Sequence, residues 1–146
     1  MIQPGQIIRP SNSLIILATN KFKKNKNMFY GFLCQWAHDE FLVANGIDFQ
    51  LYESHAPFDR TINGVNYDDK LAMMNEYGDI SKTHTIGSTE KPLWDNIGMK
   101  INSFEQIDNK DPFVFRFIKT YDYKHLRIDK SQFSSPGKAN TFYFFR

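Results

Sequence analysis

The pattern of hydrophobic and polar positions in the first third of the chain predicts short β-strands. Residues 6–9 form a short β-prone run that ends at Pro10. Residues 13–19 are almost continuously apolar, and a run of that length favours a buried strand over a helix. Residues 28–36 are rich in aromatic side chains, with Gly31 as a candidate β-bulge. We therefore expect the chain to begin with three strands.

The clearest local signal is an Asn-Gly pair between two β-prone runs. Asn45 and Gly46 separate residues 41–44 from residues 47–52. Asn and Gly both tolerate the positive φ angles that a type I′ turn requires at its two central residues. Apolar and polar side chains alternate in the second run, and those on the predicted buried face are Ile47, Phe49 and Leu51. The pattern predicts a β-hairpin over residues 41–52.

The middle of the chain is expected to hold a helix and loops. Asp68 and Asp69 precede the run 70–77 and Gly78 follows it, which matches the residue preferences at the two ends of a helix. Shorter signals nearby are a tight turn at Asn63-Gly64, a loop over 79–91, a helical turn over 92–98 and a capped turn over 103–106. Together these signals place a helix and loop insertion over residues 67–111.

The last third of the chain returns to strand-like patterns. Pro112 breaks the chain, and β-prone runs follow over residues 113–119 and 121–128. Residues 141–146 form a third run. We expect it to be paired in a sheet, because a loose aromatic tail would aggregate.

These elements predict one domain over residues 1–146. It is β-rich over residues 1–66 and 112–146, with the helix and loop insertion over 67–111 between them. We assign the chain to the α+β class, with a mainly antiparallel sheet or a partly open small barrel and a helical insertion in the middle of the chain.

Composition narrows the class of protein further. Of the 146 residues, 41% are hydrophobic, and 14 Phe and 7 Tyr supply enough burial to exclude disorder as the main state. No apolar stretch approaches about 18 residues, so we expect no membrane span. Cys34 is the single cysteine, which excludes an internal disulfide or a zinc ribbon, and its apolar neighbours predict burial. No signal-peptide pattern opens the chain, so we expect a cytoplasmic protein, with a phage or mobile element among its candidate sources.

Charge is distributed unevenly along the chain. Residues 1–38 carry five basic side chains and no acidic ones, and residues 39–111 carry fourteen acidic and six basic ones. Residues 112–146 carry seven basic and two acidic side chains. If both ends of the chain join one sheet, this distribution predicts one basic and one acidic face. The alternative is that the opposite charges solvate different loops.

The four histidines are weak candidates for catalysis. His38 and His55 each follow or precede acidic residues, and a carboxylate can raise the basicity of an imidazole and fix its tautomer. His84 lies in the hydroxyl-rich run 83–89, a type of segment that can bind phosphate, and His125 lies among basic and aromatic residues. None of the four has the spacing of a metal site, and no nucleotide-binding motif is present. We therefore expect no metal and no cofactor, and an ordinary structural or surface role for each histidine.

Basic residues interleaved with aromatic ones in the last third suggest a nucleic-acid contact. Cations bind phosphates, and exposed rings stack on bases. On a strand, alternate residues from 119 onward share one face. The predicted contact residues are Lys119, Tyr121, Tyr123, Lys124 and Arg127, joined by Lys23 and Lys24 of a lysine-rich turn.

Three classes of function remain open. The first is a small intracellular protein that binds nucleic acid or another polyanion through its basic, aromatic C-terminal hairpin. The second is a structural or assembly subunit whose β-edges pair with another copy or another protein. The third is a metal-independent nuclease or nucleotide-processing enzyme that uses His with Lys or Arg. We expect the first, a binding protein rather than an enzyme.

Overall fold

The computed structural model describes residues 1–52, 58–80, 83–86, 98–122 and 140–143, with the backbone alone described over 83–86 and 140–143. The helices are α1 (Asn12–Lys21) and α2 (Lys26–Ala44). The strands are β1 (Ile7–Ile8), β2 (Gln50–Leu51), β3 (Arg60–Ile62), β4 (Val65–Ala72), β5 (Thr83–Ile86), β6 (Met99–Gln106), β7 (Phe115–Asp122) and β8 (Asn140–Tyr143). Neither of these helices combines the length and the apolar character that crossing a membrane requires.

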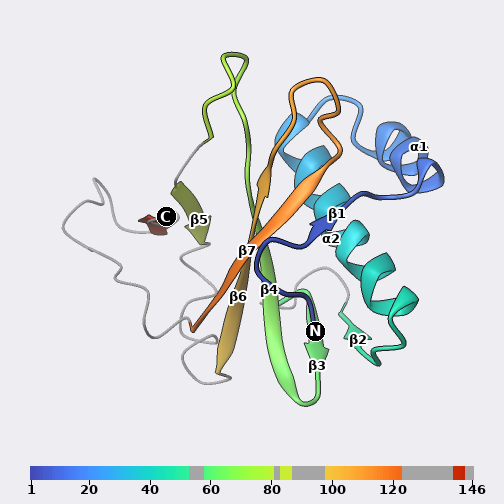
Figure 1. The fold of residues 1–146 in the computed structure, drawn as a ribbon, viewed down its shortest axis with the longest axis vertical. Coiled ribbons are helices and arrows are strands. Elements are labelled where there is room, and N and C mark those ends of the chain that lie inside the picture. The colour runs from blue at the N-terminus through green and yellow to red at the C-terminus, as the bar shows by residue number, and fades with distance from the viewer. Residues whose placement is uncertain (53–57, 81–82, 87–97, 123–139, 144–146) are drawn as a thin grey trace.

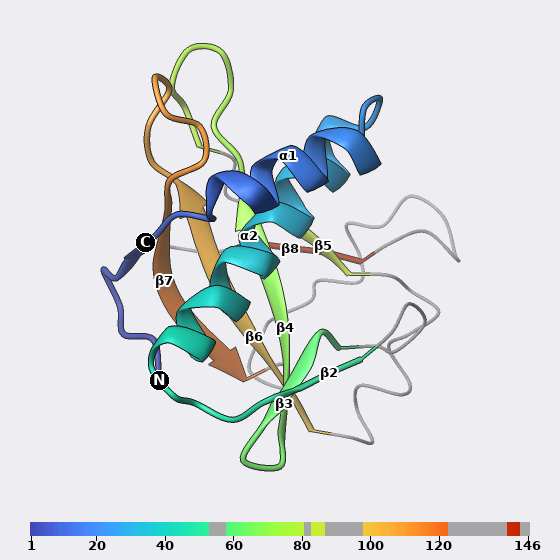
Figure 2. The ribbon, with the colours of Figure 1, turned by 90° about the vertical axis from the view of Figure 1, so that its right-hand side faces the viewer.

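Six strands form one curled sheet in the order β1-β7-β6-β4-β3-β2, and β5 pairs with β8 in a second sheet (Figure 1). Neighbouring strands are antiparallel except β4 and β6, which run parallel from the Asn66–Met99 pair to the Ala72–Glu105 pair. Both helices lie on one face of the large sheet (Figure 2). The predicted fold class, α+β with a mainly antiparallel sheet, is confirmed.

The helices lie earlier in the chain than the predicted insertion. α1 and α2 both fall between β1 and β2, whereas residues 67–111 hold most of β4 and all of β5 and β6. The runs 13–19 and 28–36, which we predicted as strands, are therefore helical. A short apolar run has no periodicity that separates a buried strand from a buried helix, so length alone misled the prediction.

Capping residues explain why these two runs fold as helices. The hydroxyl of Ser11 accepts a hydrogen bond from the N–H of Leu14 at 3.4 Å at the start of α1. The side-chain oxygen of Asn25 accepts one from the N–H of Met28 at 3.1 Å at the start of α2. Each cap satisfies a backbone donor that has no partner inside the helix. Gly31, the candidate bulge, lies inside α2.

Asn45 and Gly46 end α2 instead of forming the predicted hairpin. Asn45 has a φ of −97°, and only Gly46 has a positive φ, of 65°. The N–H of Ile47 donates to the carbonyl of Leu42 at 3.0 Å, and the N–H of Gly46 donates to the carbonyl three residues before it at 3.1 Å. These two bonds form a Schellman motif, which is a helix terminator. Residues 41–44 are therefore the last turn of α2, and the predicted second arm keeps only β2 as a strand.

A two-residue hairpin turn does occur, at Asn63 and Gly64, where the sequence predicted a tight turn. Both residues have positive φ angles, 49° and 75°, and Ile62 pairs with Val65 across them. A type I′ turn requires this combination. The turn leads directly into β4, so the predicted helix over 70–77 is wrong.

The position of β4 inside the sheet overrides its helix-like sequence. β4 is hydrogen-bonded to β3 on one side and to β6 on the other. Its side chains alternate with a period of two: Tyr67 and Leu71 pack against the core under the helices, and Asp69 contacts α2. Tertiary pairing of this kind outweighs local helix preferences of a few tenths of a kcal/mol per residue.

The other predicted elements have mixed outcomes. The capped turn predicted over 103–106 is the end of β6, and the loop predicted over 79–91 contains β5. The sequence predicted separate strands over 113–119 and 121–128, but β7 continues without a break through Thr120. β8 confirms a strand from residue 141 to 143. Residues 92–97 of the predicted helical turn over 92–98 lie outside the described residues. So do residues 123–128, which belong to the predicted strand over 121–128.

The main hydrophobic core lies between α2 and the middle of the sheet. Leu33 and Ala37 on α2 pack in one cluster with Phe104, Phe115 and Phe117 of β6 and β7, and all five are buried. A smaller cluster at the other end of α2 contains Leu42, Ile62 and Tyr67. The two clusters hold α2 on the sheet from Phe29 to Leu42.

Candidate functional site

Two of the predicted C-terminal contact residues lie on β7. Lys119 is exposed, and its Nζ lies 5.4 Å from the centroid of the Tyr121 ring. The intervening Thr120 hydroxyl bonds to Asn102 on the helix side of the sheet, so Lys119 and Tyr121 face away from the helices. Burial raises the pKa of Tyr121, in keeping with a half-buried ring. Tyr123, Lys124 and Arg127 lie outside the described residues, so the predicted hairpin surface stays a prediction.

The predicted lysines Lys23 and Lys24 lie on the tight turn between α1 and α2. Lys21 ends α1 and Lys26 begins α2, so four cations lie within six residues. The turn borders a hollow of about 310 Å³, lined by Thr19, Phe22, Lys23, Lys24, Lys26 and Phe29. We call the four lysines and the hollow between them the basic turn.

Aromatic packing holds the basic turn in place. Phe22 closes α1, with its backbone N–H donating to the carbonyl of Ala18 at 2.9 Å. Its ring stacks on Phe32 of α2, with 4.8 Å between the centroids, and lies 6.2 Å from the ring of Trp36. The lysines are therefore attached to a fixed backbone rather than to a loose loop.

The electrostatics of the basic turn favour an anion. α2 has 19 residues, and the partial positive charge of its N-terminus adds to the lysine charges. Its first turn holds no acidic residue. Within the described part of the chain, none of the four lysines forms an ion pair, and only Lys21 contacts a ring, with its Nζ 5.6 Å from the centroid of Phe22. This surface consequently carries uncompensated positive charge.

The basic turn and the β7 pair do not form one surface. The turn lies at the N-terminal end of α2. β7 ends near the opposite end of the sheet in both views (Figures 1 and 2). The helices cover one face of the sheet, whereas Lys119 and Tyr121 lie on the other. The two predicted basic regions are thus separate patches.

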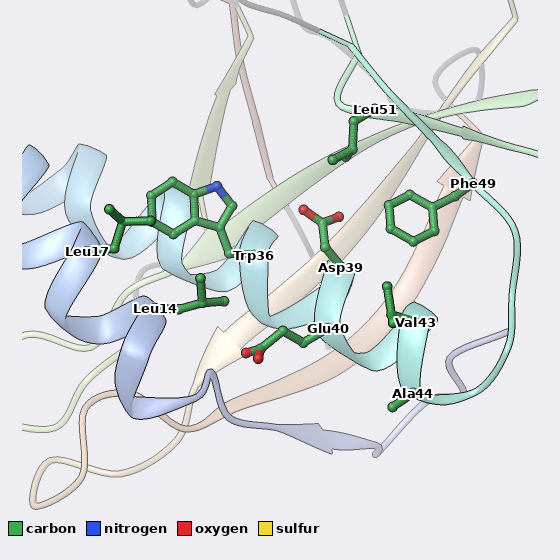
Figure 3. A pocket seen from close by; sticks show the side chains of 9 residues that line it. All are labelled: Leu14, Leu17, Trp36, Asp39, Glu40, Val43, Ala44, Phe49 and Leu51. Carbon is green, nitrogen blue, oxygen red and sulfur yellow. The ribbon is translucent and has the colours of Figure 1, made fainter.

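A second hollow, which sequence reasoning missed, lies between α1, the second half of α2 and β2 (Figure 3). We call it the apolar groove, and its volume is about 570 Å³. Two carboxylates, Asp39 and Glu40, point into it from α2. The remaining lining residues are Leu14, Leu17, Trp36, Val43, Ala44, Phe49 and Leu51.

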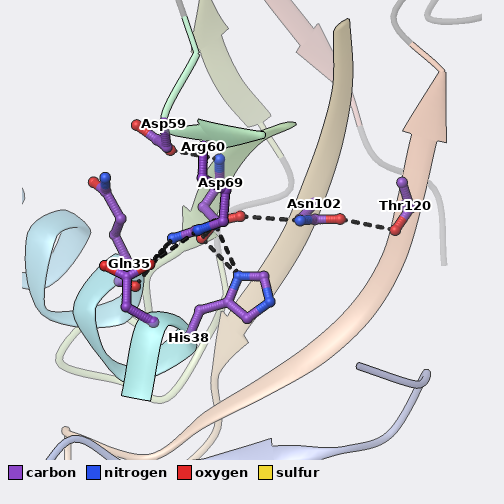
Figure 4. Close-up of polar contacts among 8 residues, drawn as sticks. Gln35, His38, Asp59, Arg60, Asp69, Asn102 and Thr120 are labelled. Atoms are coloured by element: carbon purple, nitrogen blue, oxygen red, sulfur yellow. Dashed lines mark hydrogen bonds and ion pairs between the residues drawn. The ribbon is translucent and has the colours of Figure 1, made fainter. Parts of the chain in front are cut away.

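Behind the groove, a network of buried polar side chains joins α2 to four strands (Figure 4). Its centre is Arg60, which has no exposed surface. The guanidinium donates to Asp69 at 2.5 Å, to Asp39 at 2.7 and 2.9 Å, and to the backbone carbonyl of Gln35 at 3.2 Å. One cation therefore serves two carboxylates from different elements.

The network extends from Asp69 across the sheet. The second carboxylate oxygen of Asp69 accepts a hydrogen bond from the side-chain amide of Asn102 at 3.1 Å. The amide oxygen of Asn102 in turn accepts one from the hydroxyl of Thr120 at 2.8 Å. Nδ1 of His38 lies 3.0 Å from a carboxylate oxygen of Asp69 and 2.9 Å from Nη1 of Arg60. A contact with the carboxylate requires a protonated Nδ1, and a contact with the guanidinium requires an unprotonated one, so the tautomer decides which of the two bonds forms. Nε2 of His38 is buried with no hydrogen-bond partner in the structure.

The pKa values of the buried acids in and beside the network shift in opposite directions. Asp59 belongs to this group because it accepts a hydrogen bond from the backbone N–H of Asp69 at 2.7 Å. Burial acts to raise the pKa of Asp69, but Arg60 and His38 outweigh it and lower that pKa. Burial, with the negative charges of Asp68 and Asp69, raises the pKa of Asp59 well above its usual range. Burial also raises the pKa of Asp39, and Arg60 opposes this effect only in part.

The buried network suits a structural role better than a catalytic one. His38 has no exposed surface, so no substrate reaches it. His55 and His125 lie outside the described residues, and for His84 the structure gives only a backbone position on β5, paired with Phe142. Cys34 is buried as expected, and burial raises the pKa of its thiol, which keeps it an unreactive thiol. Among the described residues, no three acidic, His or Cys side chains form a group that could hold a metal ion.

No protein-family model, curated protein or solved structure matches this chain.

Sequence reasoning found the basic turn but not the groove or the network. The run 36–40 was considered for the adjacency of His and acid, yet its relevant property is helical spacing, which places Trp36, Asp39 and Glu40 on one side of α2. Arg60 gave no signal, because its partners are distant in sequence. Asp69 was interpreted as part of a helix start, although its position between Tyr67 and Leu71 at strand spacing was a weak signal of a buried acid.

Proposed function

We propose that this protein binds a polyanion, with single-stranded nucleic acid as the favoured partner, at the basic turn. The observation that carries the proposal is a hollow edged by lysines that have no ion-pair partner in the described part of the chain. Phosphates supply the charge that these lysines lack, and a single strand can follow a narrow turn because its backbone bends easily. The role is that of a binding protein.

The ring geometry argues for binding without base specificity. One face of Phe22 is covered by Phe32, and Lys21 lies near its ring as well. Phe29 is half-buried and meets Phe113 edge-on, with 6.2 Å between the centroids. These rings offer an apolar floor rather than a free stacking face. Affinity should therefore come chiefly from phosphate contacts, which carry no sequence information.

Lys119 and Tyr121 form a second, separate candidate contact. Their pairing puts an exposed cation next to a half-buried ring on the sheet face away from the helices, which suits a phosphate and a base. Tyr123, Lys124 and Arg127 complete this patch as predicted from sequence. We place the basic turn first because more of its cations are described and none of them forms an ion pair with another described residue.

A charge-reversal pair tests where the polyanion binds. Lys24→Glu should weaken binding of a labelled oligothymidylate at low salt by about tenfold, because it removes one phosphate contact and adds a repulsive charge. Fluorescence anisotropy measures the affinity. The matched control is Lys100→Glu, an exposed lysine at the start of β6 that makes the same change in net charge. Equal losses in both variants would show attraction to net charge only and would contradict a site at the basic turn.

A further inference from the structure

The apolar groove has the size and shape of a small-molecule site. Its volume of about 570 Å³ falls within the range of roughly 300–1,000 Å³ that is usual for ligand pockets. Leu17, Val43 and Leu51 on its rim are 52%, 69% and 53% exposed. Apolar side chains gathered from three different elements at one exposed hollow are a recognised mark of a binding surface. The groove lies at the end of α2 away from the basic turn, so it is independent of the proposed polyanion site.

The floor of the groove carries excess negative charge. Arg60 is the cation behind it, and it is shared between Asp39 and Asp69. Arg60 binds only one carboxylate oxygen of Asp39, Oδ1, and within the described part of the chain the other oxygen has no partner. Glu40 accepts one hydrogen bond, from the N–H of Ser11 at 2.7 Å, and forms no ion pair there. Two carboxylates thus share one guanidinium, and Glu40 adds a third negative charge that no described cation pairs.

The walls of the groove are apolar, and the Asp39 and Glu40 carboxylates at its floor carry more negative charge than Arg60 balances. Together these two properties favour one kind of occupant. An aliphatic or aromatic body fills the space between Leu17, Trp36 and Phe49, and a cation at one end meets Asp39 and Glu40. An anion is repelled by the two carboxylates, and a neutral apolar molecule displaces water from them without supplying a cation in return.

We propose that the apolar groove binds a small organic cation, a protonated amine attached to an aryl or alkyl body. The ammonium group would lie between the Asp39 and Glu40 carboxylates, and the apolar body would lie along α1 toward β2.

Two probe molecules test this assignment on the full chain. Phenylbutylamine carries the cation and the aryl body, and phenylbutanol is a neutral analogue of the same length. Calorimetric titration should give an affinity for the amine about tenfold higher than for the alcohol, the scale of one partly solvated charge pair. Equal affinity for both molecules, or no binding of the amine, would overturn the proposal.

Three variants locate the binding. Glu40→Gln keeps the acceptor for Ser11 but removes the charge, so it should lower the affinity for the amine severalfold and leave the alcohol unchanged. Glu76→Gln, at an exposed acid on the turn after β4, is the matched control and should change neither. Val43→Arg places a bulky cation on the rim at an exposed position that does not support the fold, and should abolish binding of both molecules. Unchanged amine binding in Glu40→Gln and Val43→Arg would place the amine elsewhere and overturn the assignment.

The oligomeric state gives an independent check. Light scattering should find that Val43→Arg has the same mass in solution as the unmodified chain. A dimer that Val43→Arg dissociates would show that a second copy covers the groove, and would replace the small-cation proposal.

Discussion

At the scale of single residues, the buried network around Arg60 is the most demanding feature of the molecule. A guanidinium without exposed surface is costly to bury unless its charge and its donors are satisfied. Asp39, Asp69 and the carbonyl of Gln35 supply those partners from α2 and β4. The arrangement fixes which part of α2 lies over which part of the sheet, because a shifted helix would leave Arg60 unpaired.

Two substitutions in this network should have opposite effects on stability. The pKa of Asp69 is lowered in the fold, so its ionised form stabilises the protein above the unfolded pKa of about 3.9, and that stability is lost as pH falls through the folded pKa. Near pH 7, Asp69→Asn should lower the free energy of unfolding by about 3 kcal/mol, because Arg60 loses a charged partner. Urea denaturation followed over a pH series measures both the loss and its pH dependence.

Asp59 should behave in the opposite way. Its pKa is raised in the fold, so the folded protein binds the Asp59 proton more tightly than the unfolded chain does. The free energy of unfolding therefore falls as pH rises from the unfolded pKa of about 3.9 through the folded pKa. Asp59→Asn resembles the protonated form and keeps an acceptor for the N–H of Asp69. The variant should therefore be more stable than the unmodified chain near pH 7, and the gain should vanish near pH 3. A loss of stability at neutral pH would contradict the charge pairing described for this network.

At the scale of elements, α2 connects the two candidate sites. Its N-terminus lies in the basic turn, and its second half lines the groove with Asp39 and Glu40. The ends of the helix are set by Asn25, which caps the start, and by Gly46, which adopts the left-handed conformation just after the end. Both sites therefore depend on where this helix starts and stops.

Two glycine substitutions test the ends and the interior of α2. Gly46→Ala should destabilise the protein by about 1–2 kcal/mol, because a side chain disfavours the positive φ of 65° that the helix terminator needs. Gly31→Ala is the matched control inside the helix, where an added Cβ meets no atom within 4 Å. That control should stabilise the protein by up to about 1 kcal/mol. Thermal denaturation measures both, and an unchanged melting temperature in Gly46→Ala would contradict the Schellman termination.

The sequence was informative about turns and caps but less so about which element follows them. Asn63-Gly64 was correctly identified as a tight turn because both residues favour positive φ. Asn45-Gly46 has the same pair of residues, yet it ends a helix, since only Gly46 adopts positive φ. The difference lies in the preceding segment, whose helical state is decided by the cap at Asn25 and by packing on the sheet. Neither influence is visible in a short window of sequence.

The candidate sites show the same limit. The lysines of the basic turn are adjacent in sequence, so composition alone indicated them. The groove and the Arg60 network combine residues from α1, α2 and three or more strands, and their proximity depends on the sheet order. Only the spacing of Trp36, Asp39 and Glu40 could have suggested that one side of a helix carries both apolar and acidic groups.

At the scale of the whole molecule, the described charges change sign along α2, and the predicted basic and acidic faces of the sheet stay a prediction. Lys21, Lys23, Lys24 and Lys26 lie at or before the start of α2, whereas Asp39 and Glu40 lie in its second half. β1 does join β7 in one sheet, which brings the N-terminal segment beside a basic strand. The strongest described concentration of positive charge is nevertheless the basic turn, where the lysine charges and the helix dipole add together.

The salt dependence of binding is the sharpest test of whether a polyanion binds at the basic turn. The affinity of the unmodified chain for an oligothymidylate is measured over a series of salt concentrations. Phosphate contacts to the four lysines release counterions from a single strand, and each contact contributes roughly 0.7 to the slope of log affinity against log salt. Four contacts should therefore give a linear plot with a slope of about −3. A slope near zero, or no binding even at the lowest salt, would contradict a polyanion site at the basic turn.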